Sequence, residues 1–204
     1  MIFLKYNLTN SVITTNNIKS KYYTKLFDIL KISIGVNIKE KFNHRVVSQD
    51  VNYQIDENIY LISEIPTLSI TNVINEALFV EKNRVLMKDT FDHENALVID
   101  DNGYLTIFNS CSHKGVINTI NAVKAKFPDK EIKNYIGGFH LYNQATKRTQ
   151  TDKFIKELGN ELSKTNVIFY TCHCTGEYSF NILKRILKNK ISLIKTGDVI
   201  KIPN

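Results

Sequence analysis

The stretch Val167-Ile168-Phe169-Tyr170-Thr171-Cys172-His173-Cys174-Thr175-Gly176 runs from a short apolar segment directly into a histidine. The same order recurs twice upstream, where 104–108 leads into Cys111-Ser112-His113 and 132–136 leads into Gly137-Gly138-Phe139-His140. Open α/β sheets build their sites where loops from the carboxyl ends of several strands converge. Three imidazoles delivered to such an edge predict a metal or phosphate site.

The segments that separate these apolar runs have helical spacing. Val116, Ile120, Val123 and Phe127 fall on one helical face, and the ranges 154–162 and 180–187 repeat the pattern. Before them, Ala96 to Ile99 and Tyr104 to Phe108 flank the turn Asp100-Asp101-Asn102-Gly103, which predicts a β-hairpin. Hairpins followed by helix–strand units predict an α/β fold of the α+β sandwich type, with a mixed sheet and flanking helices in one domain over 1–204.

Several other elements are predicted from shorter patterns. The apolar spacing within Asn16 to Leu30 indicates a helix. The remaining expectations are a strand over Ile59 to Ile62, a hairpin of Leu78 to Val80 with Val85 to Met87, a strand over Ile191 to Ile194 and a final strand over Val199 to Ile202.

Composition narrows the class of protein. A hydrophobic share of 43% is typical of a folded chain, and no apolar stretch approaches the roughly 20 residues of a membrane span. Met1-Ile2-Phe3-Leu4-Lys5 does not resemble a signal peptide, so a cytoplasmic location is expected for the protein. The three cysteines are accordingly expected to be reduced thiols. The net charge of +7 comes from dispersed lysines, which favours a solvated basic surface over a nucleic-acid-binding one.

His173 lies between two thiols, and imidazole and thiolate are both good zinc ligands. Because successive residues of an extended segment point in opposite directions, the simpler geometry has His173 as the ligand with Cys172 and Cys174 packed beneath it. The alternative is a core histidine bonded to a carbonyl group.

The other two loops also allow two interpretations each. His113 is either a ligand or a loop histidine before a helix that begins near Gly115, where free amides also suit an anion. His140 follows two glycines that permit close approach of backbone and ligand, although a flexible turn explains the same pair. His44 and His93 are expected on the surface, and Asp198 in a turn rather than at a metal.

Three short motifs carry a resemblance to a known family. They are Ser110-Cys111-Ser112-His113-Lys114-Gly115, Gly137-Gly138-Phe139-His140-Leu141 and His173-Cys174-Thr175-Gly176. Through them the range 92–202 resembles the C-terminal half of a metallo-β-lactamase-fold protein, in the branch that includes dihydropterin-ribofuranosyl-aminobenzene phosphate synthase. Tyr53 to Pro66 and 95–98 extend the resemblance.

The resemblance implies roles for the motif residues. His113 and His173 would be ligands of zinc or another divalent transition metal, and His140 would be a third ligand or a contact to a substrate phosphate or carboxylate. The supporting loop residues would be Cys111, Ser112, Gly137, Gly138, Cys174 and Thr175. No catalytic side chain is assigned beyond these.

One family motif does not occur in the 204 residues. Family members carry H-x-H-x-D-H in an N-terminal half, and Ser110 stands where the family has glycine. We therefore expect a hydrolase homologue that lacks its N-terminal half and shows little or no activity alone. A complementary chain or a homodimer would complete it, and a small-molecule phosphate or ester would be its substrate. The alternatives are a non-catalytic remnant or interaction module and, third, a basic nucleic-acid-binding protein.

Overall fold

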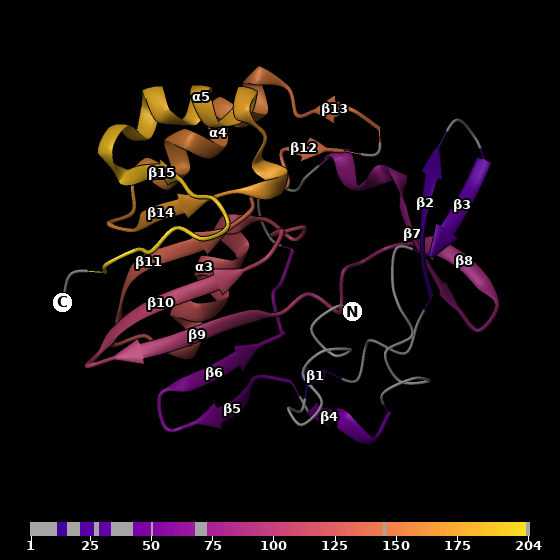
Figure 1. The fold of residues 1–204 in the computed structure, drawn as a ribbon, viewed down its shortest axis with the longest axis horizontal. Coiled ribbons are helices and arrows are strands. Elements are labelled where there is room, and N and C mark those ends of the chain that lie inside the picture. The colour runs from indigo at the N-terminus through magenta and orange to yellow at the C-terminus, as the bar shows by residue number, and fades with distance from the viewer. Residues whose placement is uncertain are drawn as a thin grey trace.

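A seven-stranded mixed sheet is the largest element of the computed structural model, which describes residues 12–15, 21–26, 29–33, 43–49, 51–67, 73–144 and 146–202. Its strand order is β15-β14-β11-β10-β9-β6-β5 (Figure 1). Parallel pairing joins β10, β11, β14 and β15, whereas β5, β6, β9 and β10 pair antiparallel. The strands are β5 Tyr53–Asp56, β6 Ile59–Ile62, β9 Ala96–Asp101, β10 Tyr104–Asn109, β11 Glu131–Gly137, β14 Ile168–Thr171 and β15 Ile191–Leu193.

Three helices, α3 Val116–Lys126, α4 Asp152–Ser163 and α5 Glu177–Leu187, pack on one face of this sheet. Alternate residues of β9 and β10, such as Val98 and Ile107, join the helical apolar stripes in one core, as strand alternation and helical periodicity require. Figure 1 shows α3 behind β10, with α4 and α5 over the β14 end of the sheet. Among the described helices, none has the length and apolar character of a membrane span.

A second, four-stranded antiparallel sheet lies beside the end of the first sheet in Figure 1, in the order β3-β2-β7-β8. Its strands are β2 Lys21–Leu26, β3 Ile29–Ser33, β7 Leu78–Lys82 and β8 Val85–Lys88. Two small pairs complete the described strands, β1 Val12–Thr15 with β4 Val46–Gln49, and β12 Tyr142–Asn143 with β13 Arg148–Thr149.

The helix predicted over Asn16 to Leu30 is wrong where the structure describes it. Residues 21–26 form β2 and residues 29–30 begin β3, while 16–20 and 27–28 lie outside the described residues. Lys21-Tyr22-Tyr23-Thr24 is rich in aromatic and β-branched side chains, and β7 pairs with it across Tyr22↔Val80. Pairing with a strand more than 50 residues away overrides a local spacing that mimics a helix.

The final strand predicted over Val199 to Ile202 is also wrong. These residues pair with no strand in the part of the chain that the structure describes, and Val199 is 87% exposed. The turn before them is as expected, because Asp198 accepts a hydrogen bond from the Lys195 backbone N–H at 2.8 Å. The hairpins, the later helices, and the strands at 59–62, 132–136, 167–170 and 191–194 are confirmed, within one or two residues at their ends.

Gly137 fixes the spacing of β10 and β11 at their carboxyl ends. Its φ is 153°, and a Cβ atom there would lie 1.7 Å from the backbone oxygen of Asn109. No side chain fits between two hydrogen-bonded strands at that distance. The register Asn109↔Gly137 therefore depends on glycine.

We expect Gly137→Ala to lower the free energy of unfolding by at least about 3 kcal/mol, because overpacking against backbone adds to an unfavourable φ. Urea denaturation followed by circular dichroism measures this. Gly103→Ala is the matched control: Gly103 has a φ of 88° but no atom within 4 Å of a Cβ, so only backbone strain of about 1 kcal/mol should result. Equal losses in the two variants would contradict the steric argument.

Candidate functional site

Three neighbouring parallel strands deliver the three predicted histidines to one edge of the large sheet. His113 follows β10, His140 follows β11 and His173 follows β14. All three line one pocket with a volume of about 430 Å³. The structure thus brings the predicted residues together, while their role as ligands stays a prediction.

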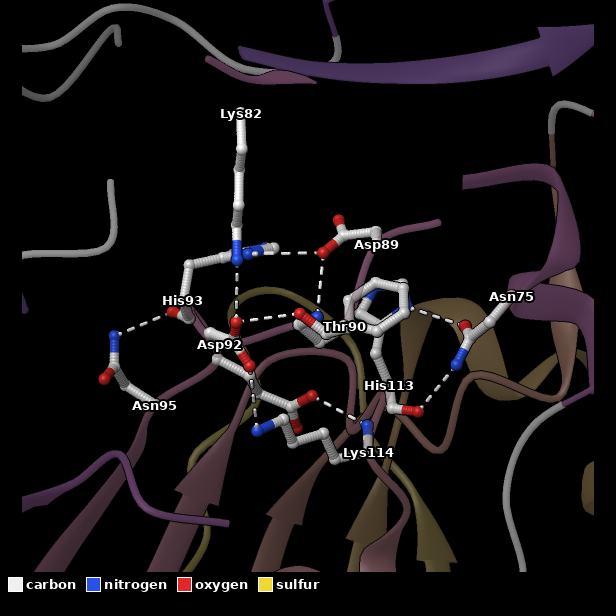
Figure 2. Close-up of polar contacts among 11 residues, drawn as sticks. Asn75, Lys82, Asp89, Thr90, Asp92, His93, Asn95, His113 and Lys114 are labelled. Atoms are coloured by element: carbon white, nitrogen blue, oxygen red, sulfur yellow. Dashed lines mark hydrogen bonds and ion pairs between the residues drawn. The ribbon is translucent and has the colours of Figure 1, made fainter. Parts of the chain in front are cut away.

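Asn75, in a short 3-10 helix over Val73–Ala77, holds the loop and the ring of His113 (Figure 2). Its side-chain amide donates to the His113 backbone oxygen at 2.8 Å, and its Oδ1 lies 3.1 Å from His113 Nδ1. Because a carboxamide oxygen only accepts, Nδ1 carries the proton and Nε2 keeps its lone pair. Phe91 stacks on the same ring, with centroids 4.4 Å apart and an interplanar angle of 8°.

His140 contacts His113, with ring centroids 3.8 Å apart. His140 is 6% exposed, and both of its ring nitrogens are buried with no hydrogen-bond partner. An unpartnered buried polar group is unfavourable by about 1–3 kcal/mol, so two such atoms beside a pocket indicate a position shaped for a ligand. The backbone at His140 is also in the left-handed region, with a φ of 47°.

Burial keeps these two imidazoles neutral. It lowers the pKa of His113 to about 2, with a further lowering from His140, and it lowers the pKa of His140 to about 4, with a further lowering from His173. Neutral imidazole is the form that offers a lone pair to a metal ion. At neutral pH, His113 and His140 are therefore in the state that a ligand must have.

His173 is exposed and opens the short 3-10 helix His173–Thr175 with a φ of 50°. Cys174 is buried and Cys172 is half-buried. The Cys174 thiol is in hydrogen-bonding contact with Cys111, and this contact lowers the pKa of Cys111 and raises that of Cys174.

The predicted supporting residues tie the three loops to one another. The buried Ser112 hydroxyl donates to the Gly138 backbone oxygen at 2.7 Å, which joins the β10 loop to the β11 loop. Thr175 accepts a hydrogen bond from the Phe139 backbone N–H at 3.0 Å, which joins the β14 loop to the same segment. The three histidine loops therefore form one hydrogen-bonded unit.

Glu94 anchors the His113 loop from below. It is 7% exposed and accepts hydrogen bonds from the Asn109 side chain and the Lys114 backbone N–H, each at 2.8 Å. Burial raises its pKa, although these hydrogen bonds and the charge of Lys114 oppose the rise. Glu94, Asn75 and Phe91 were not predicted, because no periodic pattern marks them and they lie 19 to 38 residues from His113 in sequence.

The surface prediction for His44 is confirmed, but the one for His93 is wrong. The His93 side chain is 30% exposed, its ring lies 4.2 Å from that of Tyr22, and its Nδ1 lies 3.8 Å from Asp89 Oδ1. Figure 2 shows His93 within a network that also contains Lys82 and Asp92. Strand β2 covers His93, and the mistaken helix over that segment concealed this contact.

Comparison with known proteins identifies the fold of this chain. The sequence matches no family model and no curated protein. The structure is similar to the crystal structure of Tm1679, a metal-dependent hydrolase of the β-lactamase superfamily, with a TM-score of 0.78 at 22% identity over 97% of this chain and 73% of that one. The chain has a metallo-β-lactamase-like fold. This confirms the predicted fold, but it gives no support to the particular branch that the motifs suggested.

Replacement of Asn75 tests the orientation of His113. In Asn75→Ala the Nδ1–H of His113 loses its acceptor, so the proton should redistribute toward Nε2, and zinc affinity should fall by roughly tenfold or more. Imidazole ¹⁵N chemical shifts and two-bond couplings report the tautomer without any metal. Asn121→Ala, on the exposed side of α3, is the control and should leave the His113 tautomer and the zinc affinity unchanged. A His113 tautomer that is the same in Asn75→Ala and wild type would contradict the assignment.

The two buried histidines predict a loss of stability in acid. Below pH ~6.5 the unfolded chain binds protons at both imidazoles, whereas the folded chain does not until pH approaches about 4 and 2. Metal-free protein in a chelator should therefore lose roughly 1 kcal/mol for each histidine as the pH falls from about 6 to 5. Urea denaturation at each pH measures the slope. His140→Gln should reduce it, while His44→Gln should not; equal slopes in all three proteins would count against neutral buried imidazoles.

Proposed function

We propose that this chain supplies part of the metal site of a metal-dependent hydrolase, in which His113, His140 and His173 face the metal or the substrate. The observation that carries the proposal is the contact between His113 and His140 in the 430 Å³ pocket, where both ring nitrogens of His140 are buried without a partner. The similarity to a metal-dependent hydrolase of the β-lactamase superfamily supports the same conclusion.

The donor set fits such a metal in part. Two neutral imidazoles, one with its Nε2 lone pair kept free by Asn75, are suitable for zinc or a related divalent ion. Within residues 12–202 as far as they are described, no group of three His, Cys, Asp or Glu side chains is arranged to hold one ion. We propose that a chain bearing H-x-H-x-D-H or a second copy of this chain contributes the further donors.

The residues of this chain would bind and orient rather than transfer protons. Asn75 holds the His113 ring in one tautomer, Phe91 stacks against that ring, and Cys174 accepts a hydrogen bond from the His140 backbone N–H at 3.3 Å. When bound, the metal supplies Lewis-acid activation of water and of the bond to be cleaved. The pocket volume suits a small-molecule phosphate or ester substrate.

Metal titration and activity assays test this proposal. The isolated chain should bind zinc weakly by calorimetry, and His113→Ala, His140→Ala and His173→Ala should each weaken binding by roughly tenfold or more, because each removes a donor. His44→Ala, an exposed histidine outside the pocket, is the control. Phosphodiesterase and esterase turnover should be negligible for the chain alone and should appear on co-expression with a segment bearing H-x-H-x-D-H.

Two results would contradict the proposal. Tight stoichiometric zinc with turnover by the isolated chain would mean that its own residues complete the site. Zinc binding that is unchanged in all three pocket variants would mean that the pocket is not the metal site, and would favour a non-catalytic interaction module.

A further inference from the structure

Two of the three cysteines meet at the wall of the histidine pocket. The Cys111 and Cys174 thiols are in hydrogen-bonding contact and both line the pocket, although 63 residues separate them in sequence. Cys174 Sγ also lies 3.7 Å from the Cys111 backbone oxygen. Cys172, by contrast, is half-buried and is not among the pocket-lining residues.

Gly138 is the reason that these thiols meet. A Cβ atom at Gly138 would lie 2.6 Å from Cys174 Sγ and 2.9 Å from the Ser110 backbone oxygen. With no side chain there, the β10 loop and the β14 loop close across the β11 loop. The His140 backbone N–H then donates to Cys174 Sγ at 3.3 Å and holds that sulfur in place.

We propose that Cys111 and Cys174 are an oxidative modification site, and that peroxide converts them to a disulfide that joins the His113 loop to the His173 loop. In the first step one thiol is oxidised to a sulfenic acid as hydrogen peroxide is reduced and one water leaves. In the second step the other thiol attacks the sulfenic sulfur, the S–S bond forms and a second water leaves. Two thiols and one peroxide thus give one disulfide and two waters.

The site favours this pair over the other two pairings. An S–S bond is about 2.05 Å long. Two cysteines can therefore form it with little movement of their loops only where their side chains already lie close together. For Cys111 and Cys174 the required movement is small, because Cys174 Sγ lies 3.7 Å from the Cys111 backbone oxygen and both residues line one pocket. Cys172 is half-buried and does not line this pocket, so neither pairing that includes Cys172 shares the same pocket wall. The inference extends beyond the proposed hydrolase and does not require a bound metal.

Mass spectrometry of the reduced, metal-free chain treated with hydrogen peroxide tests the proposal. The intact mass should fall by about 2 Da, the number of maleimide-reactive thiols should fall from three to one, and a tryptic map should link the Cys111 and Cys174 peptides. Dithiothreitol should reverse all three changes. Cys172→Ser is the matched control and should form the same disulfide, whereas Cys111→Ser and Cys174→Ser should not form an intramolecular one.

Three outcomes would overturn the proposal: a disulfide that includes Cys172, an intermolecular disulfide dimer on a non-reducing gel, or mass gains of sulfinic and sulfonic acids with no disulfide. Because the readout is a covalent bond formed without metal or substrate, its failure is distinguishable from failure of the hydrolase proposal. Absence of zinc binding or turnover would leave this result unaffected.

Discussion

The lack of a side chain at Gly137 and Gly138 is the constraint on which the pocket depends. At Gly137 a Cβ would meet the backbone of β10, and at Gly138 it would meet the Cys174 sulfur. Substitution at either position would push two of the three histidine loops apart. The contacts that define the site, Ser112 with Gly138 and His140 with Cys174, require that closeness. A packing condition on two glycines thus determines where three imidazoles lie.

Backbone strain accompanies this arrangement. Ser112, His140 and His173 all have φ near 50°, a region that is unfavourable by about 1–3 kcal/mol for a residue with a side chain. One such residue lies in each histidine loop, and each of these loops is fixed by buried hydrogen bonds to its neighbours. Strain at three adjacent loop positions that also carry the site residues is typical of a functional edge.

The sequence predicts the later part of the fold better than the earlier part, for a physical reason. From β9 onward, strands and helices alternate with clear periods of two and 3.6, and neighbours in sequence are neighbours in space. Before β9, strand β2 pairs with β7 across more than 50 residues, so the local spacing of Tyr22 and Leu26 is misleading. The three histidines could be predicted from local pattern because each lies within four residues of a strand end. Asn75 and Glu94 could not, since their partners are distant in sequence.

The positions of the carboxylates constrain the proposed metal site. Two buried carboxylates hold structure: Glu94 accepts hydrogen bonds from the Asn109 side chain and the Lys114 backbone N–H, and Asp89 accepts one from the Phe91 backbone N–H at 2.8 Å. Of the described residues that line the pocket, none is acidic. Neutral imidazoles do not offset the charge of a bound ion, in a protein whose net charge is already +7. In the proposed site any carboxylate ligand would therefore come from the complementary segment, whose H-x-H-x-D-H motif contains an aspartate.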